Sequence, residues 1–170
     1  MITEDWQTSP RQYDIRIERN VTISVRGGLK LVCDVFRPSA AGKFPALFMI
    51  SPYDRAQQSM EMVPIAFPGV DRGSLEVGDF NFYVRRGYAF VIAQLRGTFG
   101  AEGDFGNLHP DAETIQDIAD AIEWVATQPW CDGKVAMHGV SYFSVVQKRA
   151  AVRSEEHTSE LQSHSFISYA

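Results

Sequence analysis

The stretch Val135-Ala136-Met137-His138-Gly139-Val140-Ser141-Tyr142 places a serine directly after an apolar run and a glycine. The apolar run predicts a buried strand, and the residues after the serine predict a helix. A glycine two residues before the serine lets strand and helix approach closely at a strained turn. Such a strand-to-helix turn presents a serine hydroxyl as a nucleophile, so Ser141 is a candidate catalytic residue.

The residues after Ser141 depart from the common nucleophile turn at one position. A second glycine usually lies two residues after the serine. Phe143 occupies that position here, and the small residue Ser144 follows it. Gly-x-Ser without structural context is more typical of a helix N-cap. The predicted strand and helix on either side of Ser141 favour the nucleophile.

Composition indicates one ordinary globular domain. The chain has 170 residues, of which 45% are hydrophobic and 22% charged, and its net charge is −5. Without a basic stripe it is not expected to bind nucleic acid. No apolar run approaches the roughly 20 residues of a membrane helix. The N-terminus has no signal-peptide pattern, and Cys33 and Cys131 lack metal-site spacing, so we expect buried, reduced thiols in a cytoplasmic protein.

The hydrophobic pattern predicts a hairpin followed by alternating strands and helices. Alternating apolar residues on both sides of the Gly27-Gly28 turn predict the hairpin. Continuous apolar runs predict three strands covered on both faces, at residues 44–50, 88–93 and 135–138. Helices are expected over residues 111–127 and from Ser141 onward. This order indicates an α/β domain with a parallel sheet wrapped on both faces.

Two polar segments follow predicted strands, at the edge of the sheet where ligands bind in α/β proteins. Tyr53, in the segment 51–55, could donate its hydroxyl to a developing oxyanion beside Ser141. The alternative for this segment is a Ser-Pro turn with a surface ion pair. In the loop 94–103, Arg96 is expected to organise the backbone through carboxylate pairs rather than to take part in catalysis.

The remaining titratable residues are weaker candidates. His138 is too close to Ser141 in sequence to act as its base, and we interpret it as a core histidine. His109, in a loop, is a weak candidate for the base. Asp111 and Asp117 are expected at the start and on the solvent face of the 111–127 helix.

Several segments, in a shared order and spacing over about residues 20–150, resemble one family of enzymes. They are Arg37-Pro38, Pro52-Tyr53-Asp54, Arg86-Gly87-Tyr88, Arg96-Gly97-Thr98 with Glu102-Gly103, the run from Asp117 to Val135, and Gly139-Val140-Ser141-Tyr142. They are similar to the X-Pro dipeptidyl-peptidase (S15) and cocaine-esterase-like serine hydrolases.

The resemblance implies an incomplete α/β-hydrolase fold that ends just after the nucleophile turn. Ser141 would attack the carbonyl of a small-molecule ester or peptide, and no metal or organic cofactor is implied. The backbone N–H of Tyr142 and the hydroxyl of Tyr53 would hold the oxyanion. In the family the catalytic Asp and His follow the serine, beyond a helical cap. They have no counterpart here, so this chain by itself is expected to be inactive.

The chain departs from the family at four positions. Gln94 and Gly27 stand where the family usually has Asp, and Ala101 replaces a common Ser. Ser144 replaces the last glycine of the motif, a change that could tighten the turn.

Residues 153–170 interrupt an apolar, helix-like run with RSEEHTSELQSHSFISYA. Arg153–Ser163 and Ile167–Ala170 resemble the translated constant parts of a short-read sequencing adapter, separated by a barcode. We therefore interpret residues 1–152 as the N-terminal part of an α/β-hydrolase domain and residues 153–170 as a non-native tail. A polar, frayed C-terminus is the alternative.

Two other functions remain open at this point. One is a different α/β-hydrolase, such as a dienelactone-hydrolase-like esterase, whose nucleophile turn more often carries Cys or a strict Gly-x-Ser-x-Gly. The other is a non-catalytic α/β binding module that keeps the serine. The sequence does not predict the oligomeric state.

Overall fold

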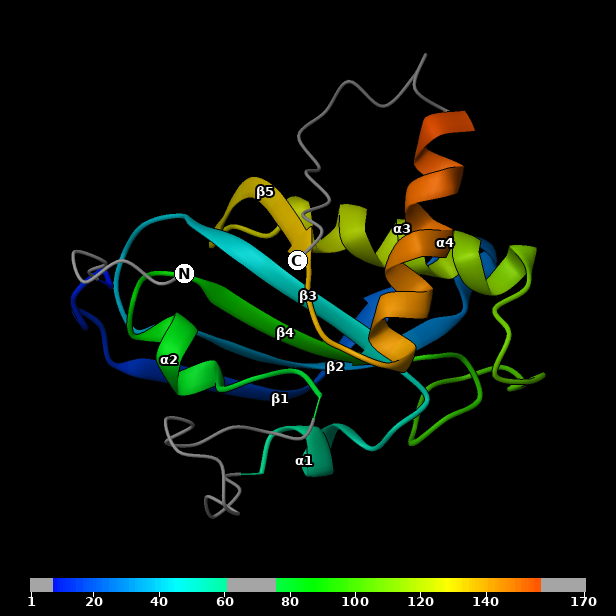
Figure 1. The fold of residues 1–170 in the computed structure, drawn as a ribbon, viewed down its shortest axis with the longest axis horizontal. Helices are drawn as coiled ribbons and strands as arrows, with labels where there is room; N and C mark the ends of the chain where they lie inside the picture. Colours follow the sequence, from blue (N-terminus) through cyan, green and yellow to red (C-terminus); the bar gives the residue numbers. More distant parts are fainter. Residues whose placement is uncertain (1–7, 61–75, 157–170) are drawn as a thin grey trace, which may run out of the picture.

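The computed structural model describes residues 8–60 and 76–156, which form one five-stranded sheet with flanking helices (Figure 1). The strands are β1 (Ile15–Ser24), β2 (Lys30–Pro38), β3 (Phe44–Ser51), β4 (Ala89–Gln94) and β5 (Cys131–Met137). The helices are α1 (Arg55–Gln58), α2 (Phe80–Val84), α3 (Ala112–Ala126) and α4 (Tyr142–Glu156), and a 3-10 turn spans Arg26–Gly28. The predicted hairpin, three buried strands and two long helices are all present, although β5 begins four residues earlier than predicted.

The sheet combines an antiparallel hairpin with three parallel strands. Its strand order is β1-β2-β4-β3-β5. β1 pairs antiparallel with β2, and β2 pairs antiparallel with β4. β3 lies between β4 and β5 and is parallel to both. The carboxyl ends of the three parallel strands therefore share one edge, where the loops after β3 and β4 and the start of α4 lie (Figure 1).

Helices cover both faces of the sheet because successive strand residues point to opposite sides. One apolar cluster includes Val35, Phe48 and Val91 from the strands and Ile118 from α3. A second cluster includes Phe36, Met49 and Phe90 from the strands and Val84 from α2. The prediction of a sheet wrapped on both faces is confirmed.

Helix α3 confirms one prediction about its charges and corrects another. Asp111 caps the helix, and its carboxylate accepts a hydrogen bond from the Thr114 N–H at 2.8 Å. The prediction that Asp117 lies on the solvent face is wrong, because this residue is only 2% exposed. Asp117 precedes Ala121 and Val125 at four-residue spacing, and all three lie on the buried face of the helix.

The predictions for the two cysteines and for the C-terminal residues have different outcomes. Cys33 and Cys131 are buried and unpaired, as expected. The non-native tail predicted at residues 153–170 lies outside the described residues from 157 onward, while residues 153–156 continue α4. Its interpretation stays a prediction. None of the described helices combines the length and hydropathy needed to cross a membrane.

The free edge of β5 leads to a prediction about the isolated chain. Among the described strands, β5 pairs with β3 alone, so its other edge is open. An open edge on an apolar parallel sheet is a template for association with other chains. We expect the isolated 170-residue chain to aggregate or to be partly molten in size-exclusion chromatography and thermal circular dichroism. A monodisperse monomer with a sharp cooperative melt would contradict this expectation.

Candidate active site

The turn between β5 and α4 holds Ser141 in a left-handed backbone conformation. Its φ is 59°, a value that non-glycine residues adopt rarely and at a cost in local strain. Ser141 is exposed and lies between the end of β5 and the start of α4, at the carboxyl edge of the parallel strands. The strained strand-to-helix turn that the motif predicts is therefore present, with its serine open to approach.

The turn packs so tightly that only glycine fits at position 139. Gly139 has a φ of +119°, and a Cβ there would lie 2.7 Å from the Cβ of Phe143. It would also lie 3.3 Å from the backbone oxygen of Glu76. The same Glu76 carbonyl accepts a hydrogen bond from the Val140 N–H at 3.0 Å. The turn is thus fixed against the segment that precedes α2.

Side chains from α4 hold the turn from the other side. The Gly139 carbonyl accepts a hydrogen bond from the Ser144 hydroxyl at 3.2 Å and another from the Gln147 amide at 3.1 Å. The Ser144 bond is one that a glycine at this position could not make. Sequence reasoning did not identify Gln147, because a polar residue in a helix carries no pattern that reveals its partner. The two bonds tie the first turns of α4 to the end of β5.

The two residues predicted to hold an oxyanion are neighbours in the structure. Tyr53 follows β3 by two residues, and Tyr142 is the first residue of α4. Their ring centroids are 5.9 Å apart in an edge-to-face arrangement, and the Tyr53 ring lies 6.4 Å from the ring of Phe143. The loop after β3 and the residue after Ser141 therefore meet at the carboxyl edge of the sheet.

Both predicted oxyanion donors are free of a partner within the described part of the chain. The backbone N–H of Tyr142, in the first turn of α4, has no acceptor there. The hydroxyl of Tyr53 has no partner there either, although the Tyr53 N–H donates to the Ser51 hydroxyl at 3.2 Å. Burial raises the pKa of the Tyr142 phenol to about 12, and Tyr53 adds to the rise. The Tyr142 phenol is therefore neutral, and its hydroxyl is buried without a hydrogen-bond partner among the described residues.

The described histidines form no hydrogen bond with Ser141. The His138 Nε2 atom lies 3.4 Å from the Tyr83 hydroxyl, and burial lowers the pKa of His138, so its imidazole is neutral at pH 7. His109 is exposed in a loop. Within residues 8–60 and 76–156 the Ser141 hydroxyl makes no hydrogen bond to a base, and no three His, Cys, Asp or Glu residues are grouped to hold a metal ion.

Arg96 has the structural role that the sequence predicted. Its guanidinium lies 2.6 Å from Asp117 on the buried face of α3 and 2.6 Å from Glu113 one turn earlier. The loop after β4 is closed by a bond from the Gly97 N–H to the Glu102 carbonyl. Arg96 therefore holds this loop against α3, and the partner that makes this possible is Asp117.

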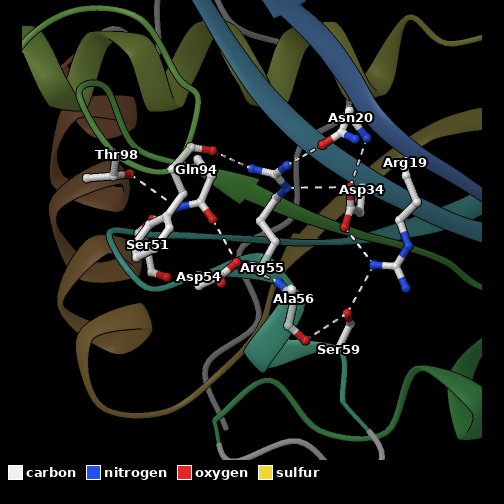
Figure 2. A network of polar contacts seen from close by, with 11 residues as sticks. Arg19, Asn20, Asp34, Ser51, Asp54, Arg55, Ala56, Ser59, Gln94 and Thr98 are labelled. Atoms are coloured by element: carbon white, nitrogen blue, oxygen red, sulfur yellow. Dashed lines mark hydrogen bonds and ion pairs between the residues drawn. The ribbon is translucent and has the colours of Figure 1, made fainter.

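Sequence reasoning missed a polar network around Arg55 (Figure 2). Asp54 and Arg55 do not form a surface ion pair, because Asp54 caps α1 and Arg55 is only 8% exposed. The Arg55 Nε atom lies 3.4 Å from Asp34, and the Arg55 N–H donates to the Gln94 side chain at 2.8 Å. One signal was available, because Gln94 ends an otherwise apolar buried strand and a buried amide requires hydrogen-bond partners.

Comparison with known sequences identifies relatives that are much longer than this chain. The sequence model of the X-Pro dipeptidyl-peptidase (S15) family matches residues 27–167. Cocaine esterase from Rhodococcus sp. (strain MB1 Bresler) is 37% identical over 136 residues, which cover 80% of this chain and 21% of that protein. The chain thus spans about a fifth of the length of this curated relative.

Solved structures with a similar fold are also longer. A CocE/NonD family hydrolase from Staphylococcus aureus matches with a TM-score of 0.70 and 29% identity, covering 83% of this chain and 26% of that chain. An α-amino acid ester hydrolase matches with a TM-score of 0.64 and 28% identity, covering 88% of this chain and 25% of that chain. The described sheet and helices correspond to about a quarter of each of these proteins.

The tight turn leads to a prediction about Gly139. In the full-length protein that contains this segment, Gly139→Ala should slow labelling of Ser141 by a fluorophosphonate probe by at least about 10-fold, because the new Cβ displaces the first turn of α4. Gly106→Ala is the matched control, since a Cβ there meets nothing within 4 Å. Equal labelling rates for both variants and the parent would show that the turn tolerates a side chain.

Proposed function

The chain belongs to the X-Pro dipeptidyl-peptidase (S15) family and has part of an α/β-hydrolase fold, and from this premise we propose that it is the N-terminal part of a serine hydrolase. Ser141 is the nucleophile, and the bond cleaved is an ester or an amide. The match to this family favours it over a dienelactone-hydrolase-like esterase.

The observation that carries this proposal is the left-handed backbone of Ser141, at the edge of the sheet where the Tyr142 N–H and the Tyr53 hydroxyl have no partner among the described residues. A serine held at φ 59° between a parallel strand and a helix is a costly arrangement. A helix N-cap alone does not require it, because N-cap residues have extended backbones. The Tyr142 N–H and the Tyr53 hydroxyl, which have no partner among the described residues, explain why such strain would be kept, because both can bind negative charge.

In the proposed reaction, the Ser141 Oγ attacks the substrate carbonyl carbon while a base takes the hydroxyl proton. The carbonyl oxygen becomes an oxyanion, which accepts hydrogen bonds from the Tyr142 N–H and the Tyr53 hydroxyl. Collapse of this intermediate expels an alcohol or an amine and leaves an acyl group on Ser141. Water, activated by the same base, then releases the acid and restores the serine.

The catalytic histidine and aspartate are proposed to come from sequence beyond Ser141 in the longer protein. His138 is held near Tyr83, and His109 is exposed in a loop. Without a base the serine hydroxyl is a weak nucleophile at neutral pH. The isolated chain is therefore proposed to be inactive. The substrate remains open between a proline-containing peptide, an ester and an acyl amide.

A serine-directed fluorophosphonate probe tests the nucleophile. The full-length protein should be labelled, and Ser141→Ala should abolish the labelling. Ser39→Ala, at an exposed position, should be labelled at the parent rate. The isolated chain should be labelled at least about 10³-fold more slowly than the full-length protein, because the base is absent.

Two results would count against this function. No labelling of the full-length protein would favour a non-catalytic binding module. Labelling that persists in Ser141→Ala would place the nucleophile at another residue.

A further inference from the structure

A network of polar side chains adjoins the loop that carries Tyr53 and links it to β1, β2 and the end of β4 (Figure 2). From this network we propose that Gln94 is a positioning residue, whose carboxamide clamps the Ser51–Arg55 loop and so fixes the Tyr53 hydroxyl beside Ser141. The inference rests on the proposed function, in which Tyr53 donates to the oxyanion.

Gln94 contacts the backbone on each side of Tyr53. It is the last residue of β4 and is fully buried, with 0% exposure. Its Oε1 accepts a hydrogen bond from the Arg55 N–H at 2.8 Å, and its Nε2 donates to the Ser51 carbonyl at 3.3 Å. Tyr53 lies midway between these two anchored groups. The loop therefore cannot shift at either end without breaking a bond to Gln94.

Thr98 sets the orientation of the Gln94 amide. The Thr98 hydroxyl donates its proton to the Leu95 carbonyl at 2.8 Å. It can therefore only accept from Gln94, whose Nε2 lies 3.1 Å away. The amide nitrogen must face Thr98 and Ser51, which leaves the amide oxygen for the Arg55 N–H. A carboxylate at this position could accept from Arg55 but could not donate to Ser51, so the clamp depends on an amide.

The Arg55 side chain secures the same loop from the opposite direction. Its guanidinium donates to the Asn20 side chain at 2.7 Å and to the Phe99 carbonyl at 3.1 Å, and it lies 3.4 Å from Asp34. Asn20 lies at an irregularity of β1 and has a φ of 55°. A buried, paired arginine contributes little net stability because its desolvation is costly. Its contacts instead restrict where the loop can lie.

The position of Tyr53 matters because an oxyanion donor acts over a short range. The donor must lie about 2.7–3.1 Å from the oxyanion, and a displacement of about 1 Å can cost on the order of 10²-fold in rate. The Tyr53 ring itself makes apolar contacts, edge-on with Tyr142 and Phe143 and against the two apolar clusters. Apolar contacts of this kind tolerate sliding, whereas the directional bonds of Gln94 do not.

The test is a double-mutant cycle on ester hydrolysis by the full-length protein. Tyr53→Phe should lower kcat by about 10²-fold, the usual effect of losing one oxyanion donor. Gln94→Glu should lower kcat by about 10-fold with KM unchanged, because the loop moves but substrate binding does not. The double variant should be no slower than Tyr53→Phe alone, because Gln94 acts through the Tyr53 hydroxyl.

Matched variants separate positioning from general damage. Gln57→Glu adds the same charge at an exposed position of α1 and should have the parent kcat. Thr98→Val removes the acceptor that orients the amide and should lower kcat, whereas Thr98→Ser keeps the hydroxyl and should restore it. If Gln94→Glu does not fold, comparing kcat of Thr98→Val with that of Thr98→Ser still tests the positioning role of Gln94.

Each unfavourable outcome identifies which idea fails. If the effects of Tyr53→Phe and Gln94→Glu multiply, or if Gln94→Glu and Thr98→Val both keep the parent kcat, the positioning role is refuted and the role of Tyr53 stands. If Tyr53→Phe leaves kcat unchanged, the oxyanion role of Tyr53 fails, and the inference about Gln94 fails with it.

Discussion

The left-handed backbone at Ser141 is the constraint on which the candidate site depends. Such a conformation costs about 1–3 kcal/mol for a residue with a side chain. Three hydrogen bonds brace the turn, from Val140 to Glu76 and from Ser144 and Gln147 to Gly139. Each contributes about 1 kcal/mol net, so together they are comparable to the strain. The turn persists because its neighbours hold it from two sides.

Besides the turn at Ser141, the candidate site requires that groups far apart in sequence share one edge of the sheet, and the parallel strands provide this. β3, β4 and β5 run in the same direction. Tyr53, Gln94 and Ser141 lie at or just after the carboxyl ends of these strands, and therefore at the same edge of the sheet. Apolar clusters on both faces of the sheet fix the strands, so the loops at this edge start from rigid supports. A site built in this way depends on strand register more than on the loops themselves.

Two pairs of charged side chains hold the segments that follow β3 and β4 at this edge. Arg55, which follows β3, faces Asp34 of β2. Arg96, which follows β4, pairs with Asp117 of α3. Removing charged groups from water costs several kcal/mol for each ion, and a good pair does little more than offset that cost. Such pairs therefore contribute more to a defined loop geometry than to stability. Loops held in this way suit a site whose donors must meet a substrate atom within a few tenths of an ångström.

Several features of this chain follow from its sequence alone. The alternating pattern of the hairpin, the continuous apolar runs of the inner strands and the 3.6-residue period of α3 are local signals, and each element formed where its signal lies. The turn at Ser141 is also local, because glycine, serine and their flanking elements lie within a few residues. The resemblance to a family added the pairing of Tyr53 with Tyr142 as candidate oxyanion groups.

Only the tertiary structure decided which distant residues meet. The insertion of β4 between β2 and β3 cannot be read from a pattern, because strand order depends on long-range pairing. Asp117 was expected in solvent because its partner, Arg96, lies 21 residues earlier. The sequence also did not show which groups Gln94 and Gln147 contact, because both bond to segments outside their own strand or helix. Periodicity records which face of an element is buried, whereas a hydrogen bond between separate elements leaves no periodic trace in the sequence.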